Sequence, residues 1–320
     1  MRRREFIKLV CAAASIGPLA GRAAQSATAL LGFIGESSPS ATPRSLAAFR
    51  AGLAEIGYAE ERNLNIDWRL ALGEPRRLRT IAADLVSQHT GVIVTATDPA
   101  TAAAKAVTTT TPIVFLTGSD PSKNGLAGPN LTGLSWYGPD MAPLRLSLIR
   151  QFVPKADTIG FIIDPRVADT QAQVTAAREA AATMGLQLPV LEATSAGEID
   201  AAFAHLTSAR VGALVVGMSP FFLSQRDQFA ALAARHTVPA IYADYEFADA
   251  GGLVSYGHSV ADAYRRAGVY AGGILNGAKS AELPVLQTSK FELIINLKTA
   301  KALALDVPQN LRAAADEVIQ

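Results

Sequence analysis

The stretch GVIVTATDPATAA, Gly91 to Ala103, passes from a short apolar run through a small polar loop into an alanine-rich segment. The apolar and β-branched residues predict a buried strand, and the alanines after Asp98-Pro99 predict a helix. A strand, a polar turn and a helix in this order form part of a βαβ unit. The turn itself could be a catalytic corner, a phosphate cradle, a ligand clamp or a helix cap.

The same alternation of strand and helix is repeated along the chain in two series. The first series predicts strands over 29–35, 64–71, 91–97 and 112–117 and helices over 44–56, 75–88 and 99–108. A break at 130–140, rich in Gly and Pro, separates it from the second series. The second series predicts strands over 158–164, 186–193, 213–218 and 239–244 and helices over 168–184, 197–208 and 221–235. Two doubly wound (Rossmann-like) α/β lobes with parallel sheets are therefore expected.

The segments after the second series are too few for a third domain. They comprise an apolar strand over 253–257, a helix over 260–275, an extended run over 283–297 and a short helix to about residue 304. We expect these segments to cross back between the lobes. A chain of 320 residues with 49% hydrophobic content can supply a core for each lobe.

Charge excludes one class of partner. The chain has 29 basic and 28 acidic residues, and charged residues make up 18% of it. This balance lacks the basic surface that binds a nucleic-acid backbone, so no nucleic-acid partner is expected.

The first 23 residues have the layout of an export signal. The basic MRRREFIK is followed by the apolar LVCAAASIGPLA and the small-residue stretch GRAAQSA. Arg3-Arg4-Glu5-Phe6-Ile7-Lys8 resembles the twin-arginine export motif, although the Sec route stays open because Arg2 stands where a serine often precedes the pair. Cleavage near Ala23 would release a soluble periplasmic protein, since the apolar run is too short for a lasting anchor.

Several catalytic and cofactor motifs are absent. Cys11, the only cysteine, lies inside the signal, so the mature chain has no disulfide, no cysteine nucleophile and no thiolate metal site. Gly217-Met218-Ser219-Pro220-Phe221 lacks the final glycine of a hydrolase elbow, and neither phosphate-binding glycine pattern occurs. The four histidines are isolated, and His258 alone is kept as a candidate site residue. No cofactor and no metal are expected.

Four predicted strand ends share one chemistry. They are Asp98-Pro99, Asp120-Pro121, Asp164-Pro165 and Ser219-Pro220. Each can be a helix N-cap with Pro at the first helical position. Together they also line the carboxyl ends of parallel strands, where open α/β sheets bind ligands and helix N-termini favour a carboxylate. For each of these residues, both interpretations remain open: a helix cap and a ligand contact.

Aromatic residues gather at the same edges and are interpreted either as ligand contacts or as packing between the lobes. They are Trp136 and Tyr137, Phe221 and Phe222, Tyr242 and Tyr245, and Tyr256.

Three segments carry a resemblance to a known family. SKFELIINLKTAKAL (289–303), the stretch over 232–268 and PIVFLTGSDP (112–121) resemble the ABC-transporter substrate-binding family related to tryptophan- and tyrosine-binding periplasmic proteins. The resemblance implies a type I periplasmic-binding-protein fold with two lobes, a three-crossover hinge and a ligand in the inter-lobe cleft. It places lobe 1 at 28–137 with 253–282 and lobe 2 at 138–252 with 283–320.

The resemblance also implies a set of ligand contacts. Those of lobe 1 would be Glu36 and Ser37 of the first loop, Thr97 with Asp98, and Thr117 with Asp120. Those of lobe 2 would be Asp164, Ser219 and Asp244. Ser135, Trp136, Arg166, Tyr245 and Tyr256 complete the candidate set. Arg166 stands where relatives have a longer polar run and would favour a plain carboxylic acid over a zwitterion.

The function expected from these features is binding rather than catalysis. A monomeric exported receptor would close its lobes around a small, aromatic, carboxylate-bearing ligand and deliver it to an ABC permease in the membrane. Two alternatives stay open: a periplasmic sensory module that reports the ligand to a membrane partner, and an enzyme on a similar scaffold, such as a carboxylate-dependent transferase or isomerase.

Overall fold

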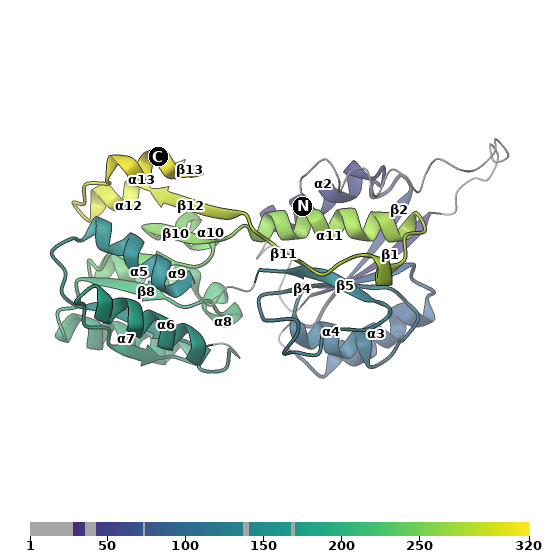
Figure 1. The fold of residues 1–320 in the computed structure, drawn as a ribbon, viewed down its shortest axis with the longest axis horizontal. Helices are drawn as coiled ribbons and strands as arrows, with labels where there is room; N and C mark the ends of the chain where they lie inside the picture. Colours follow the sequence, from purple (N-terminus) through teal and green to yellow (C-terminus); the bar gives the residue numbers. More distant parts are fainter. Residues whose placement is uncertain (1–27, 36–42, 73, 137–140, 168–169) are drawn as a thin grey trace. The chain divides into compact units, whose positions relative to one another are not determined.

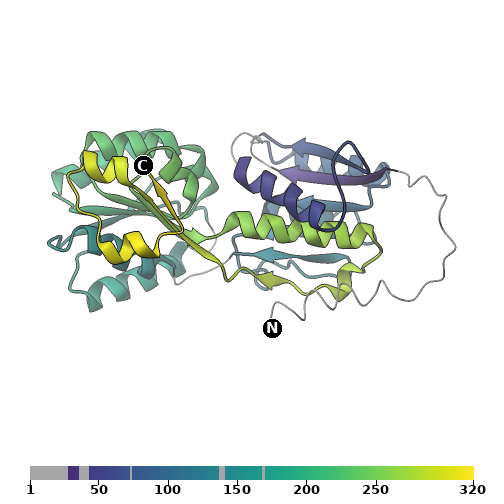
Figure 2. The same cartoon turned by 90° about the horizontal axis from the view of Figure 1, so that it is seen from above.

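The computed structural model describes residues 28–35, 43–72, 74–136, 141–167 and 170–320. The expected export signal and the candidate contacts Glu36 and Ser37 lie outside these residues. The chain divides into two compact units, Met1–Ser135 with Ala261–Leu286 and Trp136–Val260 with Gln287–Gln320. It therefore passes from one unit to the other three times (Figures 1 and 2).

The first unit has a six-stranded sheet in the order β11-β5-β4-β3-β1-β2. Its strands are β1 (Ala29–Gly35), β2 (Leu64–Leu70), β3 (Val92–Thr95), β4 (Ile113–Thr117), β5 (Leu131–Ser135) and β11 (Leu286–Gln287). The first five are parallel in every pair along the sheet. Every residue of β3, β4 and β5 is buried, as expected for parallel strands covered on both faces.

Helices cover both faces of this sheet. Figure 1 shows α2 (Pro43–Glu55) and α11 (Val260–Leu275) on one face and α3 (Arg77–Ser87) and α4 (Asp98–Lys105) on the other. In α3, buried Leu78, Ile81, Ala82 and Leu85 recur at helical spacing and face the sheet. The amphipathic pattern of the sequence thus fixes which face of each helix is buried.

Glycine allows α2 and α11 to pack with their backbones in close approach. A Cβ atom built on Gly268 of α11 would lie 2.2 Å from the Phe49 carbonyl oxygen, and one on Gly52 of α2 would lie 1.8 Å from the Arg265 carbonyl oxygen. No side chain fits at either position. This contact anchors α11 to a helix more than 200 residues earlier in the chain.

The second unit has a seven-stranded sheet in the order β13-β12-β10-β9-β8-β6-β7. Its strands are β6 (Ile159–Ile163), β7 (Val190–Glu192), β8 (Ala213–Val216), β9 (Ala240–Tyr242), β10 (Val254–His258), β12 (Phe291–Asn296) and β13 (Glu317–Ile319). The pair β10 and β12 is antiparallel, and the other pairs are parallel. The described helices of this unit are α5 (Met141–Phe152), α6 (Thr170–Thr183), α7 (Ala196–Ser208), α8 (Pro220–Ser224), α9 (Arg226–Arg235), α10 (Tyr245–Asp249), α12 (Leu297–Ala302) and α13 (Gln309–Ala314). The 3-10 turn η2 (Ser280–Glu282) belongs to the first unit.

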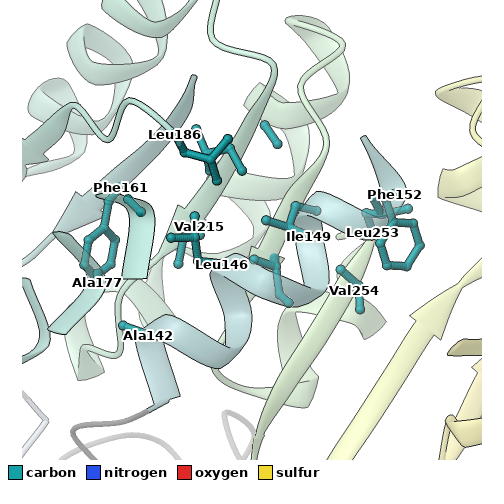
Figure 3. Close-up of a cluster of buried hydrophobic side chains, with 14 of the residues drawn as sticks. Ala142, Leu146, Ile149, Phe152, Phe161, Ala177, Leu186, Val215, Leu253 and Val254 are labelled. Atoms are coloured by element: carbon teal, nitrogen blue, oxygen red, sulfur yellow. The ribbon is translucent and has the colours of Figure 1, made fainter. Parts of the chain in front are cut away.

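The two faces of the second sheet have separate cores, because side chains along a strand alternate between faces. Phe161 and Val215 pack under α5 and α6 on one face (Figure 3), and Ile162 and Val216 pack under α7 to α10 on the other. The second core is rich in aromatic side chains. Phe222 lies at its centre with no exposure.

The expectation of two doubly wound α/β lobes is confirmed, with local differences. Residues 130–140, read as a break, contain β5, which continues the first sheet beside β4; its Thr, Gly and Ser residues concealed it. The helix α5 that follows the break, and α10, α13 and β13, were not predicted. The helix expected over 221–235 is divided at Gln225 into α8 and α9.

The units differ from the expected lobes at Trp136, at residues 283–286 and, over the longest stretch, at residues 253–260. Residues 253–260 were expected in lobe 1, but β10 pairs with β9 and β12 and so belongs to the second sheet. The pairing partners decide this assignment, because buried Val254 lies between Ile241 and Ile295 of the second sheet, and buried Ser255 lies beside Ile294.

The α2–α11 contact predicts opposite effects for two glycines of one helix. Gly268→Ala should lower the free energy of unfolding by about 1–3 kcal/mol, because the methyl group meets backbone atoms that cannot move aside. Gly273→Ala, where no atom lies within 4 Å of the added Cβ, should raise it by up to about 1 kcal/mol through helix propensity. Urea unfolding measures both, and equal stabilities of the two variants would contradict the packing described.

Candidate functional site

Each sheet has one point at which its winding reverses. In the first sheet β1 lies between β2 and β3, and in the second β6 lies between β7 and β8. Loops leaving neighbouring strands there run to opposite faces and open a crevice at the carboxyl edge. The candidate residues after β3, β6 and β8 lie at these two points.

In the first unit, Thr97 rather than Asp98 is the helix cap. Thr97 is the N-cap of α4, and its hydroxyl accepts a hydrogen bond from the Ala100 N–H at 3.3 Å. Asp98, for which a helix cap was one of the two interpretations, is the first residue of the helix, and its carboxylate accepts hydrogen bonds from the Thr117 hydroxyl and, at 2.9 Å, from Asn124. Asp98 therefore joins the ends of β3 and β4, and Asn124 is a partner that the sequence did not indicate.

Asp120 does not cap a helix either. Residues 120–124 form a turn in which the Asp120 carboxylate accepts hydrogen bonds from Ser122 N–H at 3.0 Å and from Ser122 Oγ at 2.6 Å. The hydrogen bond from Ser122 Oγ heads the interactions that lower the pKa of this carboxyl. Ser135, at the end of β5, is buried and donates to the Ser119 carbonyl at 3.1 Å. Both residues shape the loop after β4.

In the second unit, Asp164 lies at the point where the winding reverses and binds the polar side chains around it. Its carboxylate is 4% exposed and accepts hydrogen bonds from Ser219 Oγ at 2.7 Å and from the Arg166 guanidinium at 2.8 and 2.9 Å. Burial would raise the pKa of Asp164, but these donors outweigh it and hold the pKa below its ordinary value. Asp164 is not a helix cap, because α6 begins only at Thr170.

Ser219 is confirmed as a cap. Its hydroxyl accepts hydrogen bonds from the N–H groups of Phe221 and Phe222 at the start of α8 while it donates to Asp164. Ser219 thus links the ends of β6 and β8. It has no remaining donor for a ligand.

Arg166 is engaged by protein groups on two sides. Besides its paired hydrogen bonds to Asp164, its guanidinium lies 4.9 Å from the Phe221 ring centroid. Because Asp164 already neutralises its charge, the expectation that Arg166 selects a plain carboxylic acid has no support in this geometry.

A pocket in the second unit brings together a different group of side chains. Among the described residues it is lined by Trp136, Met141, Arg145, Gln173, Met218, Ala243, Asp244, His258 and Val260. Of the twelve candidate contacts among the described residues, Trp136 and Asp244 line it, and so does His258, the histidine kept as a candidate site residue. Arg145 and Gln173 come from α5 and α6, helices whose residues were not considered as site residues.

Arg145 is the buried cation of this pocket. It is 3% exposed, and its Nε donates to the Tyr256 carbonyl oxygen at 2.7 Å. Burial lowers the pKa of Arg145 to about 10, against the attraction of Asp244. One signal in the sequence could have revealed it: Arg145 occupies a position of the apolar stripe of α5, between Met141 and Ile149.

Asp244 is the N-cap residue of α10 by backbone conformation, but its carboxylate makes no capping hydrogen bond. Burial raises the pKa of Asp244 to about 6, and Arg145 opposes the rise. Burial and the charge of Asp244 together raise the pKa of neighbouring Glu246 to about 8. Tyr245 follows Asp244 in the same turn without lining the pocket in the part described.

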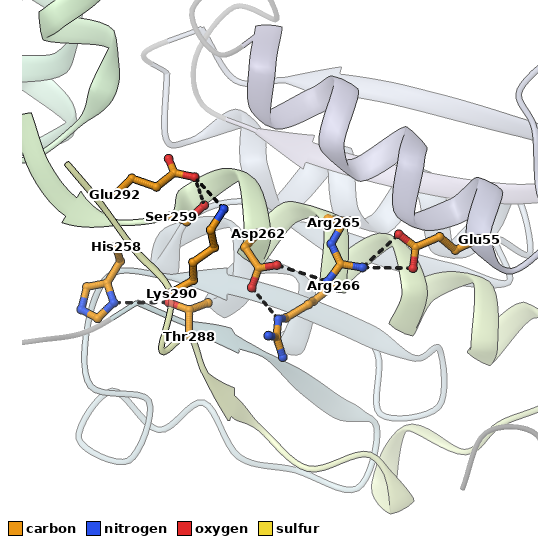
Figure 4. Close-up of polar contacts among 9 residues, drawn as sticks. All are labelled: Glu55, His258, Ser259, Asp262, Arg265, Arg266, Thr288, Lys290 and Glu292. Atoms are coloured by element: carbon orange, nitrogen blue, oxygen red, sulfur yellow. Dashed lines mark hydrogen bonds and ion pairs between the residues drawn. The ribbon is translucent and has the colours of Figure 1, made fainter. Parts of the chain in front are cut away.

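His258 completes the polar wall at the end of β10. Its Nδ1 lies 3.4 Å from Thr288 Oγ1 (Figure 4), and its Nε2 is buried without a hydrogen-bond partner in the described part of the chain. Burial lowers the pKa of the imidazole, so the ring is neutral near pH 7. Tyr256 contributes its carbonyl oxygen to Arg145, while its ring stacks on Phe291 at 6.0 Å.

The other polar contacts drawn in Figure 4 are pairs formed within one unit or the other. Glu292 accepts from Ser259 at 2.7 Å and from Lys290 at 3.2 Å, and Asp262 of α11 accepts from Arg265 and Arg266 (Figure 4). Within the described part of the chain, no group of three His, Cys, Asp or Glu side chains could hold a metal ion. No helix in that part is long and apolar enough to cross a membrane.

The raised pKa of Glu246 predicts a pH dependence of stability. Because the folded state keeps a proton on Glu246 up to about pH 8 and the unfolded state loses it near pH 4.5, stability falls as pH rises through this window. Glu246→Gln removes the titration, so its stability relative to the parent should increase between pH 5 and pH 8, on the order of 2 kcal/mol. Thermal melts across this range measure the difference.

The exposed Glu282 provides the control for this measurement. Glu282→Gln should show the same pH profile as the parent. Parallel profiles for Glu246→Gln and the parent would show that Glu246 does not titrate in this window.

Comparisons with known proteins agree with this fold. The family model described as ABC transporter substrate binding protein matches residues 38–319. A tyrosine-binding protein of Clostridioides difficile (strain R20291) is 25% identical over 261 residues, 80% of this chain and 75% of the relative.

Two solved structures extend the comparison. An ABC domain from Streptococcus pneumonia in complex with L-Trp has a TM-score of 0.79 at 25% identity, over 91% of this chain and all of that one. A ligand-free, open substrate binding protein with adhesive properties from Clostridium difficile has a TM-score of 0.71 at 23% identity, over 91% of this chain and 99% of that one. The fold is that of the periplasmic binding proteins, and the chain belongs to the family of ABC transporter substrate binding proteins.

Proposed function

We propose that this protein is an exported receptor of an ABC importer that binds an aromatic amino acid or a related small aromatic carboxylate. Family membership supplies the role of substrate binding. The ligand class is suggested by the tyrosine-binding relative and by the L-Trp complex of the similar structure. Export rests on the signal layout of residues 1–23, and delivery to a permease rests on the family.

The observation that carries the ligand class is the chemistry of the residues that line the pocket of the second unit, since the cavity itself, of about 10 Å³, has room for about one water molecule. It combines the Trp136 side chain and the apolar Met141, Met218 and Val260 with the buried guanidinium of Arg145. Apolar walls suit an aromatic ring, and a buried cation suits a carboxylate. Closure of the two units about their connecting segments remains a prediction.

Two measurements on the mature protein test this proposal. Native mass spectrometry identifies any ligand carried through purification, and thermal-shift assays compare L-tryptophan, L-tyrosine and indole-3-propionate with an aliphatic amino acid and a sugar. An aromatic carboxylate at 100 times its Kd should stabilise the protein by about 2.7 kcal/mol. Stabilisation by the sugar alone would contradict the proposed class.

Trp136 tests the place of binding. Trp136→Ala should weaken the aromatic ligand by about tenfold or more, because an aromatic wall of the pocket is lost. Trp68→Ala is the matched control, since Trp68 belongs to the first unit and donates its indole N–H to Glu60 at 3.0 Å. Equal weakening by the two changes would contradict binding in the second-unit pocket.

A further inference from the structure

We propose that Arg145 binds the ligand's carboxylate and Asp244 binds its ammonium group, so that these two residues select an α-amino acid over the corresponding plain acid. The inference rests on the proposed function for the presence of a ligand in this pocket. It assigns the groups that recognise the ligand's charges.

Arg145 has donors left over after its role in the fold. A guanidinium has five N–H donors. The structure gives Arg145 one hydrogen bond, from Nε to the Tyr256 carbonyl, and its two terminal nitrogens have no hydrogen-bond partner among the described residues. A guanidinium on a residue that is only 3% exposed, with donors left over, favours an anionic partner in the pocket that it lines.

Asp244 does not supply that partner directly. Arg145 and Asp244 line the same pocket and attract one another, but the two described side chains form no ion pair within the 4.0 Å that defines one. The Asp244 carboxylate also makes no capping contact with α10. A zwitterion placed between them would neutralise both charges, its carboxylate toward α5 and its ammonium group toward the end of β9.

The other cation at this edge cannot take the role of Arg145. Arg166 is held by two hydrogen bonds to Asp164, is 53% exposed and stacks on Phe221. A ligand carboxylate at Arg166 would have to compete with a buried carboxylate that already neutralises it. The geometry thus reverses the sequence-based expectation that a plain acid is preferred.

Other charged groups near Asp244 set its response to pH. They are Arg145 on α5, Glu246 in the same helical turn, His258 on β10, and Arg226 on α9, which acts on Glu246. A ligand ammonium group favours the ionised form of Asp244, so binding below about pH 6 should displace a proton from Asp244. Affinity for the amino acid should then fall as pH drops from 7.5 to 5.

Calorimetry of the unmodified mature protein with three ligands gives the first test. L-tryptophan has both charges, indole-3-propionate lacks the ammonium group, and tryptamine lacks the carboxylate. We expect tryptamine to bind at least about 30-fold more weakly than L-tryptophan, and indole-3-propionate about tenfold more weakly. Indole-3-propionate binding as tightly as L-tryptophan would overturn the role given to Asp244, and equally tight tryptamine would overturn that of Arg145.

Variants assign each discrimination to a residue. Arg145→Met should abolish the preference for L-tryptophan over tryptamine, and Asp244→Asn should abolish both the preference over indole-3-propionate and the loss of affinity at pH 5. Arg150→Met is the control on the same helix, because Arg150 donates to the Met184 carbonyl and does not line the pocket in the part described. It should leave all three affinities unchanged.

The outcomes separate this inference from the proposed function. Variants that fold, shown by circular dichroism, but keep the discrimination ratios of the parent would overturn the inference while the receptor function stands. If Arg145→Met does not fold, the affinities of the three ligands for the parent protein and for Asp244→Asn still test the inference. Binding of an aliphatic amino acid with the same charge discrimination would overturn the aromatic class alone, and no binding of any amino acid or carboxylate would overturn both.

Discussion

The common direction of the parallel strands in each sheet is the constraint on which the site depends. It brings polar residues distant in the sequence to one carboxyl edge: Asp98 meets Thr117 across β3 and β4, and Asp164 meets Ser219 across β6 and β8. Both pairs lie where the strands have ended and backbone groups need partners. Their first task is therefore structural.

The groups left for a ligand are those that the fold does not neutralise. Asp164 and Arg166 satisfy each other, and Ser219 is engaged both as cap and as donor. Arg145 and Asp244 are different, because they line one pocket with opposite charges and form no direct pair within the described residues. Keeping such a pair apart inside a protein is costly unless something else completes it.

The sequence predicted the layered fold well and the site only in part. Periodicity located β1, α2, β2 and α11 to within a residue or two, since long apolar patterns have one clear interpretation. Strand β5 was missed because LTGLS has few strand-forming residues, and its burial comes from its place beside β4. Tertiary pairing thus overrode local composition.

Polar residues at strand ends are the main sequence signal for the site, and they indicate Asp244 and His258, whereas Trp136 comes from the predicted break at 130–140. Arg145 and Gln173 lie on helices and reach the pocket only through the packing of α5 and α6 on the sheet. Likewise, the choice between cap and clamp at Thr97 and Asp98 depends on side-chain direction, which the repeated Asp-Pro pattern does not contain.

A crystal structure of the mature protein with its bound ligand tests the central claim most directly. We predict a ligand carboxylate about 2.7–2.9 Å from the terminal nitrogens of Arg145, with its ammonium group on Asp244 and its ring beside Trp136. A ligand whose carboxylate lies on Arg166, or whose charged groups contact neither Arg145 nor Asp244, would contradict it.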